Sequence, residues 1–317
     1  MQVNRREFLG RSLAGAAGVL VGRSLLFAGE AESPRPDAPA ASRDALAMVP
    51  LGKTKLQLCR VGMGTGMRGG NRQSNHTRMG WQRFEALIKH GWERGLRLFD
   101  VADIYGTHDF LARALEKMPR DKYSISSKIW WRGGGIPEKE RPDADVVVAR
   151  FLKELRTDYL DLVLLHCVTS ATWPQELRKQ MDILDKLKQK GTIRAHGVSC
   201  HSIEALKAAA EEPWVDSVHA RINPWGDAMD GPAASVAPLL EKLHDAGKGV
   251  VAMKVVGEGR YGSNEEKRQE SIRYVLGLGA VDCMVVGFEK PEEVDDFVPR
   301  VEKVLKDSAK VPAGAAR

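Results

Sequence analysis

The sequence predicts an α/β fold, a (β/α)8 or TIM barrel, on two observations. From residue 58 onward, eight short β-branched apolar runs alternate with longer amphipathic stretches. Such units spread over roughly 240 residues match this barrel in size and number. An open doubly wound sheet usually stops at about five or six strands, and no G-x-G-x-x-G motif opens the first helix here. The closed barrel is therefore favoured over the open sheet.

The expected strands are the apolar runs themselves, and in chain order they cover residues 59–65, 96–102, 123–129, 160–166, 194–200, 217–223, 249–255 and 282–288. Residues 141–157 and 177–191 are typical of amphipathic helices, the first with Val147, Leu152 and Leu155 on one face. Glycines end several helices in the pattern of a left-handed cap, at Gly95, Gly191 and Gly247. The order of elements is the strand–helix repeat of a barrel.

The first 31 residues have the pattern of a secretory signal rather than of the barrel. Arg5 and Arg6 precede a short Gly/Ala-rich apolar stretch (12–22), which is too short to span a bilayer. The paired arginines followed by Phe-Leu resemble a twin-arginine export signal, although Asn4 and Gly10 depart from its usual residues. This resemblance implies the twin-arginine export machinery as a partner and a periplasmic or other extracytoplasmic location.

The rest of the chain divides into a linker, the barrel and a tail. Residues 32–47 are rich in Ala, Pro, Ser and Asp and predict a linker, and residues 48–307 form the expected barrel. Residues 308–317 predict a flexible tail. No residue of the expected signal or linker marks a signal cleavage site.

Composition and charge exclude several classes of function. Hydrophobic residues make up 43% of the 317 residues and charged residues 28%, as in soluble globular proteins. No apolar run of about 18 residues occurs, so we expect no stable membrane insertion. The 48 basic and 42 acidic residues are interleaved, and this pattern predicts a mixed-charge surface and no nucleic-acid partner.

The cysteines do not form a metal-binding or disulfide framework. Cys59, Cys167, Cys200 and Cys283 lie far apart without a C-x-x-C pair, so neither an iron–sulfur cluster nor structural zinc is indicated. We therefore predict no metal. Cys167 and Cys200 nevertheless follow adjacent strands, and His201 is close in sequence. A metal site or a disulfide at this point stays open as the lesser alternative.

Three successive expected strands end in groups able to handle protons. Asp100 ends the second strand with Tyr105 five residues later, Lys128 closes the third, and His166 ends the fourth. In such barrels, chemistry sits at the carboxyl ends of the strands. A phenol is a weak acid near pH 7, and a neighbouring ammonium group lowers its pKa. We expect Tyr105 to deliver a proton, and Lys128 and Asp100 to adjust the pKa of its hydroxyl. We expect His166 to orient a carbonyl oxygen. Because no side chain supplies a hydride, a nicotinamide cofactor is implied.

Five segments in order resemble the aldo-keto reductases. They are VPLGKTKLQLCRVGMGTG (49–66), GLRLFDVADIYG (95–106), SKIWW (127–131), DYLDLVLLH (158–166) and GVSCHS (197–202). The resemblance implies an oxidoreductase that interconverts an alcohol and a carbonyl of an aldehyde, ketone or sugar-like substrate. Carried over by position, it makes Asp100, Tyr105, Lys128 and His166 the catalytic residues and NAD(H) or NADP(H) the cofactor.

The candidate cofactor site departs from that family in several positions. Ser199 matches the family's carboxamide-binding serine, but Cys200, His219 and Met253 stand where Asn, Gln and an aromatic residue are usual. Lys254 and Gly257 are placed to approach a pyrophosphate, since a cation and a close backbone path suit it. The remaining candidates lie at or just after strand ends, namely Thr65, Asp100, Gly287 and Phe288.

The loop before the last helix bears on nucleotide choice. Glu293 and Phe297 replace residues that many relatives use for the extra phosphate of NADP, and Lys290 is the only cation in GFEKPEEVDD (287–296). Carboxylates repel a phosphate but accept hydrogen bonds from a free ribose hydroxyl. The segment therefore favours NAD(H), with the choice left open.

Two other functions remain compatible with the sequence. One is an exported barrel that keeps a tightly bound nucleotide and recycles it within each turnover. The other is a non-redox accessory or binding protein on the same fold, an alternative raised by the altered cofactor segments and opposed by the intact Asp–Tyr–Lys–His set.

Overall fold

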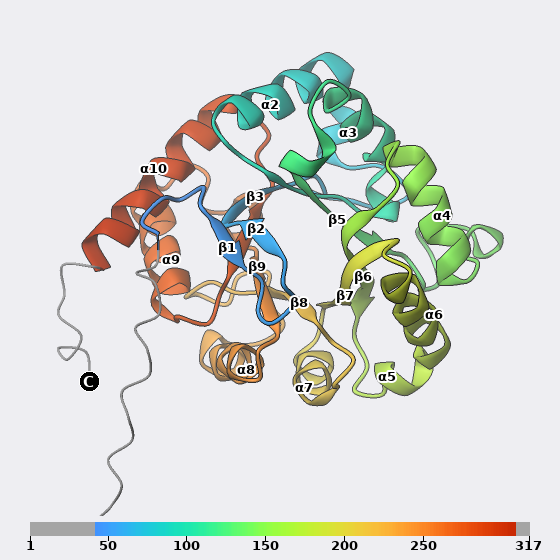
Figure 1. Ribbon diagram of the computed structural model, residues 1–317. Coiled ribbons are helices and arrows are strands. Elements are labelled where there is room, and N and C mark those ends of the chain that lie inside the picture. The colour runs from blue at the N-terminus through green and yellow to red at the C-terminus, as the bar shows by residue number, and fades with distance from the viewer. Residues whose placement is uncertain (1–41, 309–317) are drawn as a thin grey trace, which may run out of the picture. The chain divides into compact units, whose positions relative to one another are not determined.

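The computed structural model describes residues 42–308, in which eight parallel strands close into a barrel surrounded by helices (Figure 1). Neighbouring strands follow the order β10-β3-β4-β5-β6-β7-β8-β9, so each strand pairs with the next one along the chain and the last pairs with the first. The (β/α)8 prediction is confirmed. The proposed signal segment, most of the linker and nearly all of the proposed tail lie outside the described residues.

Each predicted strand is present: six are one to four residues shorter than their apolar runs, and those at 160–166 and 194–200 extend two residues and one residue beyond theirs. The barrel strands are β3 (Val61–Gly64), β4 (Leu98–Asp100), β5 (Ser124–Ile129), β6 (Leu160–Val168), β7 (Ile193–Cys200), β8 (Ser217–Arg221), β9 (Gly249–Met253) and β10 (Cys283–Val286). The strand ends carrying Asp100, Lys128 and His166 are adjacent, because β4 pairs with β5 and β5 with β6.

The helices alternate with these strands and cover the outside of the barrel (Figure 1). The two predicted helices are α4 (Ala144–Leu155) and α6 (Arg178–Gln189). The others are α1 (Asn75–Arg78), α2 (Trp81–Glu93), α3 (His108–Ala114), α5 (Trp173–Glu176), α7 (Ile203–Glu211), α8 (Ala233–Asp245), α9 (Glu265–Gly277) and α10 (Pro291–Ser308). Among the described residues, no helix is long and apolar enough to cross a membrane.

A hairpin of β1 (Met48–Pro50) and β2 (Gln57–Cys59) covers the amino-terminal end of the barrel (Figure 1). Leu51 and Leu58 pack with barrel-interior residues. The body also begins slightly before the predicted boundary at residue 48. Ala45 is fully buried and the main-chain N–H of Arg60 donates to the carbonyl of Ala47, so the last residues of the predicted linker belong to the barrel.

Strand alternation divides the core into an inner and an outer layer. Leu162 and Leu164 of β6 join the cluster inside the barrel, whereas Val163 and Leu165 join the larger cluster between strands and helices. This alternation turns His166 toward the inside. Between Leu165 and Val168 the register of β6 against β7 shifts, and Cys167 has a φ of +58°. This irregularity changes the direction of the Cys167 side chain, which would otherwise follow the alternation of the strand.

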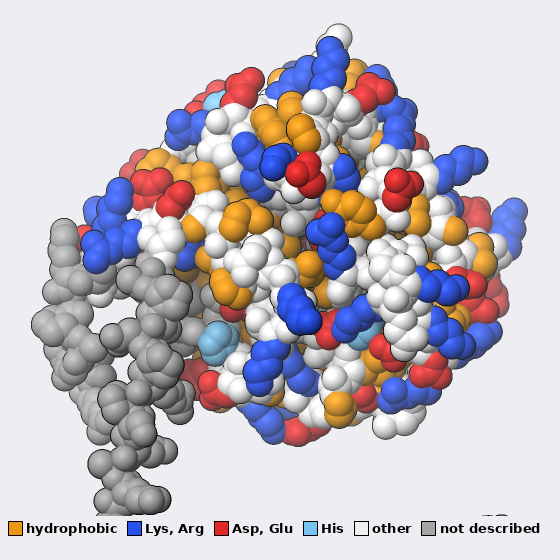
Figure 2. Space-filling model, viewed as in Figure 1, with side chains coloured by type: hydrophobic (Ala, Val, Ile, Leu, Met, Phe, Trp, Pro, Cys, Tyr) orange, Lys and Arg blue, Asp and Glu red, His pale blue; other side chains and the backbone are white. Residues whose placement is uncertain are grey.

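The surface carries both signs of charge without a large region of one sign on the face seen in Figure 2. Lysine and arginine side chains lie among aspartate and glutamate side chains, with apolar groups between them. This distribution is in keeping with the mixed-charge surface inferred from the sequence.

Candidate active site

A buried ion pair forms the base of the candidate site. Lys128 on β5 donates to both carboxylate oxygens of Asp100 on β4, and also to the carbonyl of Val101 at 3.1 Å. The Lys128 side chain is fully buried. Burial alone would raise the pKa of Asp100, but Lys128 and His219 hold it below its ordinary value. The Asp100 carboxylate therefore remains ionised inside the barrel, and its charge opposes the lowering of the Lys128 pKa that burial causes.

Tyr105 and His166 lie in front of this ion pair. Tyr105 is in the short 3-10 helix η1 (Asp103–Tyr105) that follows β4, and its hydroxyl lies 3.3 Å from Nε2 of His166. Lys128 Nζ lies 5.1 Å from the centroid of the Tyr105 ring. Burial, with smaller effects of nearby cations, lowers the pKa of His166 well below its ordinary value, so its imidazole is neutral at pH 7. The structure thus brings all four predicted catalytic residues together.

The pKa of Tyr105 shifts in the direction opposite to that expected from a neighbouring ammonium group alone. Burial of the phenol and the negative charge of Asp100 raise the pKa of Tyr105 well above its ordinary value. Lys128 donates to Asp100, so the positive charge near the phenol is paired with a negative one. Tyr105 is consequently protonated throughout the neutral range and holds a proton that it can donate, as a weaker acid than a free phenol.

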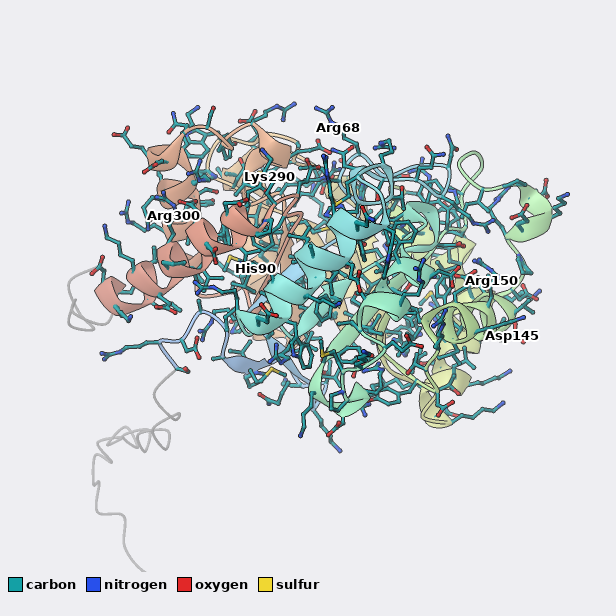
Figure 3. All side chains as sticks on the ribbon, turned by 90° about the horizontal axis from the view of Figure 1, so that it is seen from above. Arg68, His90, Asp145, Arg150, Lys290 and Arg300 are labelled. Carbon is teal, nitrogen blue, oxygen red and sulfur yellow. The ribbon has the colours of Figure 1, made fainter. Side chains whose placement is uncertain are left out.

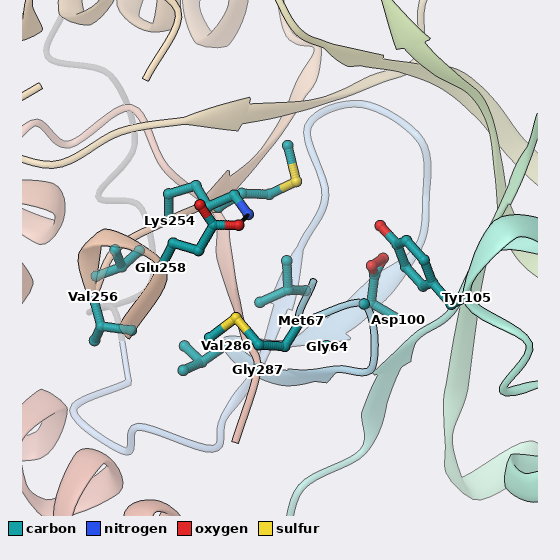
Figure 4. Close-up of a pocket in the computed structure, with 13 residues that line it drawn as sticks. Gly64, Met67, Asp100, Tyr105, Lys254, Val256, Glu258, Val286 and Gly287 are labelled. Carbon is teal, nitrogen blue, oxygen red and sulfur yellow. Dashed lines mark hydrogen bonds and ion pairs between the residues drawn. The ribbon is translucent and has the colours of Figure 1, made fainter. Parts of the chain in front are cut away.

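An elongated cleft runs from Tyr105 to the loop before α10. Its first chamber reaches Asp100 and Tyr105, and its second, of about 430 Å³, reaches Phe288 and Glu293. Four residues line both chambers and make them continuous: Met67, Val256, Val286 and Gly287. Figure 4 shows Tyr105 and Asp100 across the first chamber from the ion-paired Lys254 and Glu258. A ligand that fills both chambers is extended, with one end at Tyr105 and the other at the loop before α10.

Several predicted cofactor residues line that cleft. Met253, Lys254 and Asp100 line the first chamber, Phe288 the second, and Gly287 both. Lys254 Nζ lies 3.0 Å from Glu258 Oε1, so a pyrophosphate at this point would compete with a carboxylate for the cation. A Cβ on Gly287 would lie 3.6 Å from that of Met67, where it would narrow the cleft.

Three predicted cofactor residues have other main contacts. Thr65 is buried and donates to the carbonyl of Asp100 at 3.0 Å, so it supports the β3–β4 edge. Gly257, in the short 3-10 helix η4 (Gly257–Gly259), has φ of +59° and packs against Tyr261. Cys200 belongs to the outer apolar cluster between strands and helices, because strand alternation turns it away from the inside.

Ser199 and His219 do face the inside of the barrel. The hydroxyl of Ser199 accepts a hydrogen bond from the Cys167 main-chain N–H at 2.9 Å. His219 Nε2 lies 3.4 Å from Asp100 Oδ1, and burial lowers the pKa of His219. Its Nδ1 is buried without a hydrogen-bond partner within residues 42–308. Nδ1 of His166 is unpartnered in the same way within these residues.

The second chamber is strongly acidic. Its lining includes four carboxylates, from Glu289, Glu292, Glu293 and Asp296. Its one arginine is Arg268 of α9, whose Nε lies 3.0 Å from Asp296 and whose Nη1 donates to the Tyr261 carbonyl at 3.1 Å. Lys290 instead lines a separate groove with Arg78 and Arg83, and Figure 3 shows it on the outside of the molecule.

Four tryptophans that follow barrel strands lie in different surroundings: Trp130, Trp131, Trp173 and Trp225. The Trp130 ring lies edge-on to His166 at 5.5 Å, and Trp131 Nε1 donates to the His166 carbonyl at 2.8 Å. Trp173 is buried in the outer core. Trp225 packs against Tyr261 at 4.7 Å. Of these four, Trp130 is the one whose ring forms a wall beside His166.

Sequence reasoning did not identify Met67 and Arg268, which the structure places in the cleft. Met67 lies in the loop after β3, where no charge or periodicity marks it. Arg268 belongs to EEKRQE (265–270), a segment whose charge pattern indicates only a solvated helix face. Only the three-dimensional packing of α9 against α10 brings its guanidinium to Asp296.

The profile of the aldo/keto reductase family matches residues 60–271, more than half of the chain. The chain therefore belongs to the aldo/keto reductase family. The family works with nicotinamide nucleotides, so the predicted need for NAD(H) or NADP(H) is confirmed at this level.

Individual relatives are more distant. A D-arabinose 1-dehydrogenase from Saccharomyces cerevisiae is 33% identical over 40% of this chain and 39% of its own. An NADH-specific methylglyoxal reductase from Escherichia coli is 25% identical over 57% and 60%. The chain thus spans only about half the length of these curated relatives. A solved putative aldo-keto reductase from Pseudomonas aeruginosa has a TM-score of 0.67 at 24% identity, covering 83% of this chain and 98% of that one, and supports the fold.

The buried ion pair predicts strong coupling between its two partners. Lys128→Met leaves the Asp100 carboxylate buried alone, and Asp100→Asn leaves the ammonium alone, so each should lower the free energy of unfolding by about 3–5 kcal/mol. The double variant should lose much less than the sum. Chemical denaturation measures all three. The control Lys89→Met breaks an exposed pair with Glu85 and should cost less than about 1 kcal/mol. Additive losses at Asp100 and Lys128 would contradict the coupling.

Proposed function

We propose that this protein reduces the carbonyl group of a small aldehyde, ketone or sugar-like molecule, with Tyr105 as general acid and a nicotinamide nucleotide in the cleft. One observation carries the proposal. The Tyr105 hydroxyl lies 3.3 Å from a neutral His166, with the Lys128–Asp100 pair behind it, at one end of a cleft of two continuous chambers. The names of the two curated relatives, a methylglyoxal reductase and an arabinose dehydrogenase, support the substrate class.

The residues of this chain divide the chemistry as follows. A bound reduced nicotinamide supplies the hydride. His166 and Tyr105 converge on one point, where they hold the carbonyl oxygen, and Tyr105 gives that oxygen its proton. Lys128 stabilises the resulting phenolate through its positive charge, while Asp100 keeps Lys128 ionised in a buried position.

Replacement of Tyr105 tests this mechanism. Tyr105→Phe removes the proton donor but keeps the ring, so the turnover number should fall by about 10²–10⁴ while nucleotide affinity stays within a few fold. Because the pKa of Tyr105 is raised, wild-type reduction should show no loss from its ionisation below about pH 10. Steady-state kinetics across pH with a panel of small carbonyls, together with nucleotide titration, provides both measurements.

A comparison variant separates the role of Tyr105 from damage to packing. Tyr123→Phe makes the same change at a tyrosine packed in the outer core, away from the cleft, and should retain wild-type turnover. Lys128→Met should reduce turnover to a similar extent as Tyr105→Phe, and the double variant should lose far less than the product, because the two residues act as a unit. Near-normal turnover in Tyr105→Phe would favour the accessory-barrel function instead.

We further propose that NAD(H) binds at least as tightly as NADP(H). The acidic lining of the second chamber supports this preference, and its only arginine is already paired with Asp296. An additional phosphate would have to approach Glu293, whose Oε2 accepts a hydrogen bond from the Glu289 main-chain N–H at 2.7 Å. A ribose hydroxyl avoids this repulsion and can donate to a carboxylate.

Nucleotide titration of matched variants tests the preference. Glu293→Gln should shift relative affinity several fold toward NADP(H), because one negative charge leaves the chamber. Glu302→Gln makes the same change farther along α10, where Glu302 pairs with Lys306, and should leave the ratio unchanged. Wild-type protein that binds NADP(H) more than about tenfold tighter, or about 1.4 kcal/mol, would overturn the preference.

We also propose export by the twin-arginine route, on the basis of Arg5, Arg6 and the short apolar stretch after them. Replacing both arginines with lysine keeps the charge but should leave full-length protein in the cytoplasm. Cell fractionation with immunodetection measures the outcome, and Arg23→Lys, outside the paired motif, is the control. Delivery of the double variant across the membrane at the wild-type level would refute this route.

A further inference from the structure

One thiol and two imidazoles form a cluster at the mouth of the barrel. His166 and Cys167 come from the end of β6, and His201 directly follows β7. One ligand atom of each residue lies within 4.8 Å of the others, and Cys167 Sγ and His201 Nε2 are 3.3 Å apart. Neither Cys167 nor His201 lines the two chambers of the nucleotide cleft. The cluster is therefore a separate feature that shares only His166 with the candidate active site.

The backbone is shaped to form this cluster. In a regular strand, Cys167 would face the helices because His166 faces the inside. The register shift in β6 and the φ of +58° at Cys167 place both side chains on the same side. A non-glycine residue rarely adopts this conformation, and such outliers gather at ligand-binding and catalytic sites. Cys200, by contrast, follows regular alternation into the outer core.

We propose that His166, Cys167 and His201 bind a zinc ion. Zinc holds nitrogen at about 2.0–2.1 Å and sulfur at about 2.3 Å in a tetrahedral arrangement, so two such ligand atoms lie about 3.3–3.6 Å apart. Cys167 Sγ and His201 Nε2 lie 3.3 Å apart, a hydrogen-bond distance that is at the lower end of this range. His166 is the third member of the set, because one of its ring nitrogens lies within 4.8 Å of both other ligand atoms. Three protein ligands leave the fourth position open, as in zinc sites that exchange a water or ligand.

Neighbouring groups hold the ligands in place. The Ser199 hydroxyl accepts the Cys167 main-chain N–H at 2.9 Å, and Trp131 donates to the His166 carbonyl at 2.8 Å. His166 itself is 4% exposed, and its Nδ1 has no hydrogen-bond partner in the described part of the chain. A buried polar atom without a partner is uncommon and calls for a ligand. Such supporting contacts to metal ligands commonly raise affinity.

The surrounding charges permit a cation at this position. Arg221 and Lys254 lie at adjacent strand ends, but each is paired with a carboxylate, Asp230 and Glu258 respectively. Arg132 donates to the Cys167 carbonyl at 3.4 Å and forms no ion pair among residues 42–308. The negative charge of a Cys167 thiolate ligand offsets this one unpaired guanidinium.

Cobalt titration of tag-free protein, stripped of metal under reducing conditions, tests the site directly. One Co²⁺ per chain should bind and give the near-ultraviolet absorption of a thiolate–cobalt bond with the intense visible bands of a tetrahedral ion, and Zn²⁺ should displace it. Cys167→Ala should abolish the thiolate absorption. His201→Ala should weaken binding by at least about tenfold. The matched control Cys200→Ala removes the neighbouring thiol outside the cluster and should retain the wild-type spectrum.

A second measurement needs no variant and covers the case in which Cys167→Ala fails to fold. Zinc should slow alkylation of Cys167 in the wild-type protein, followed by peptide mass mapping, at least tenfold relative to metal-free protein. No stoichiometric cobalt binding, thiolate absorption that persists in folded Cys167→Ala, or an unchanged alkylation rate would each overturn the site. None of these measurements depends on carbonyl reduction. Inhibition of reduction by zinc, through its hold on His166, is a consequence that rests on the proposed function.

Discussion

Lys128 and Asp100 meet inside the barrel where both charges are removed from water, and the position of the other site groups depends on this contact. The ammonium group donates to both carboxylate oxygens and to the Val101 carbonyl, so it fixes the ends of β4 and β5 to each other. Tyr105 lies in the short helix η1 that follows β4, so its position depends on the end of that strand. His219 Nε2 contacts Asp100 at 3.4 Å. Removing two charges from water is costly unless each has several partners. Here Asp100 contacts both Lys128 and His219, and Lys128 also donates to the Val101 carbonyl.

The same alternation of side chains that builds the barrel core also determines which polar groups reach the mouth. His166, Ser199 and His219 face the inside because they continue the inward positions of β6, β7 and β8. Cys167 reaches the mouth only because the β6 ladder is interrupted there, and it then contacts His201. A regular barrel thus supplies the reductase groups, and one backbone irregularity supplies a thiol beside them.

The barrel and the catalytic set were predictable from the sequence because both follow from local patterns. Buried parallel strands are continuous apolar runs, and Asp100, Lys128 and His166 are polar residues that end such runs. The direction of Cys200 was not predictable, since it depends on the strand register, nor was the bulge at Cys167. The raised pKa of Tyr105 comes from burial and from the charge of Asp100, and both depend on distances that spacing along the chain does not contain. Arg268 depends on how two helices pack.

The two ends of the cleft bear on different parts of the proposed reaction. Tyr105 and His166 bear on proton transfer, and the acidic second chamber bears on the choice of nucleotide. A protonated phenol beside a neutral imidazole can give a proton to a carbonyl oxygen, which is the step that the proposed reduction requires. The acidic lining of the far chamber is the basis of the proposed preference for NAD(H). Loss of the proton from Tyr105 leaves a phenolate near the Asp100 carboxylate, and the positive charge of Lys128 offsets the repulsion between these two negative groups. In the proposed reduction, the charge retained on the fully buried Lys128 is therefore what makes the loss of this proton less costly.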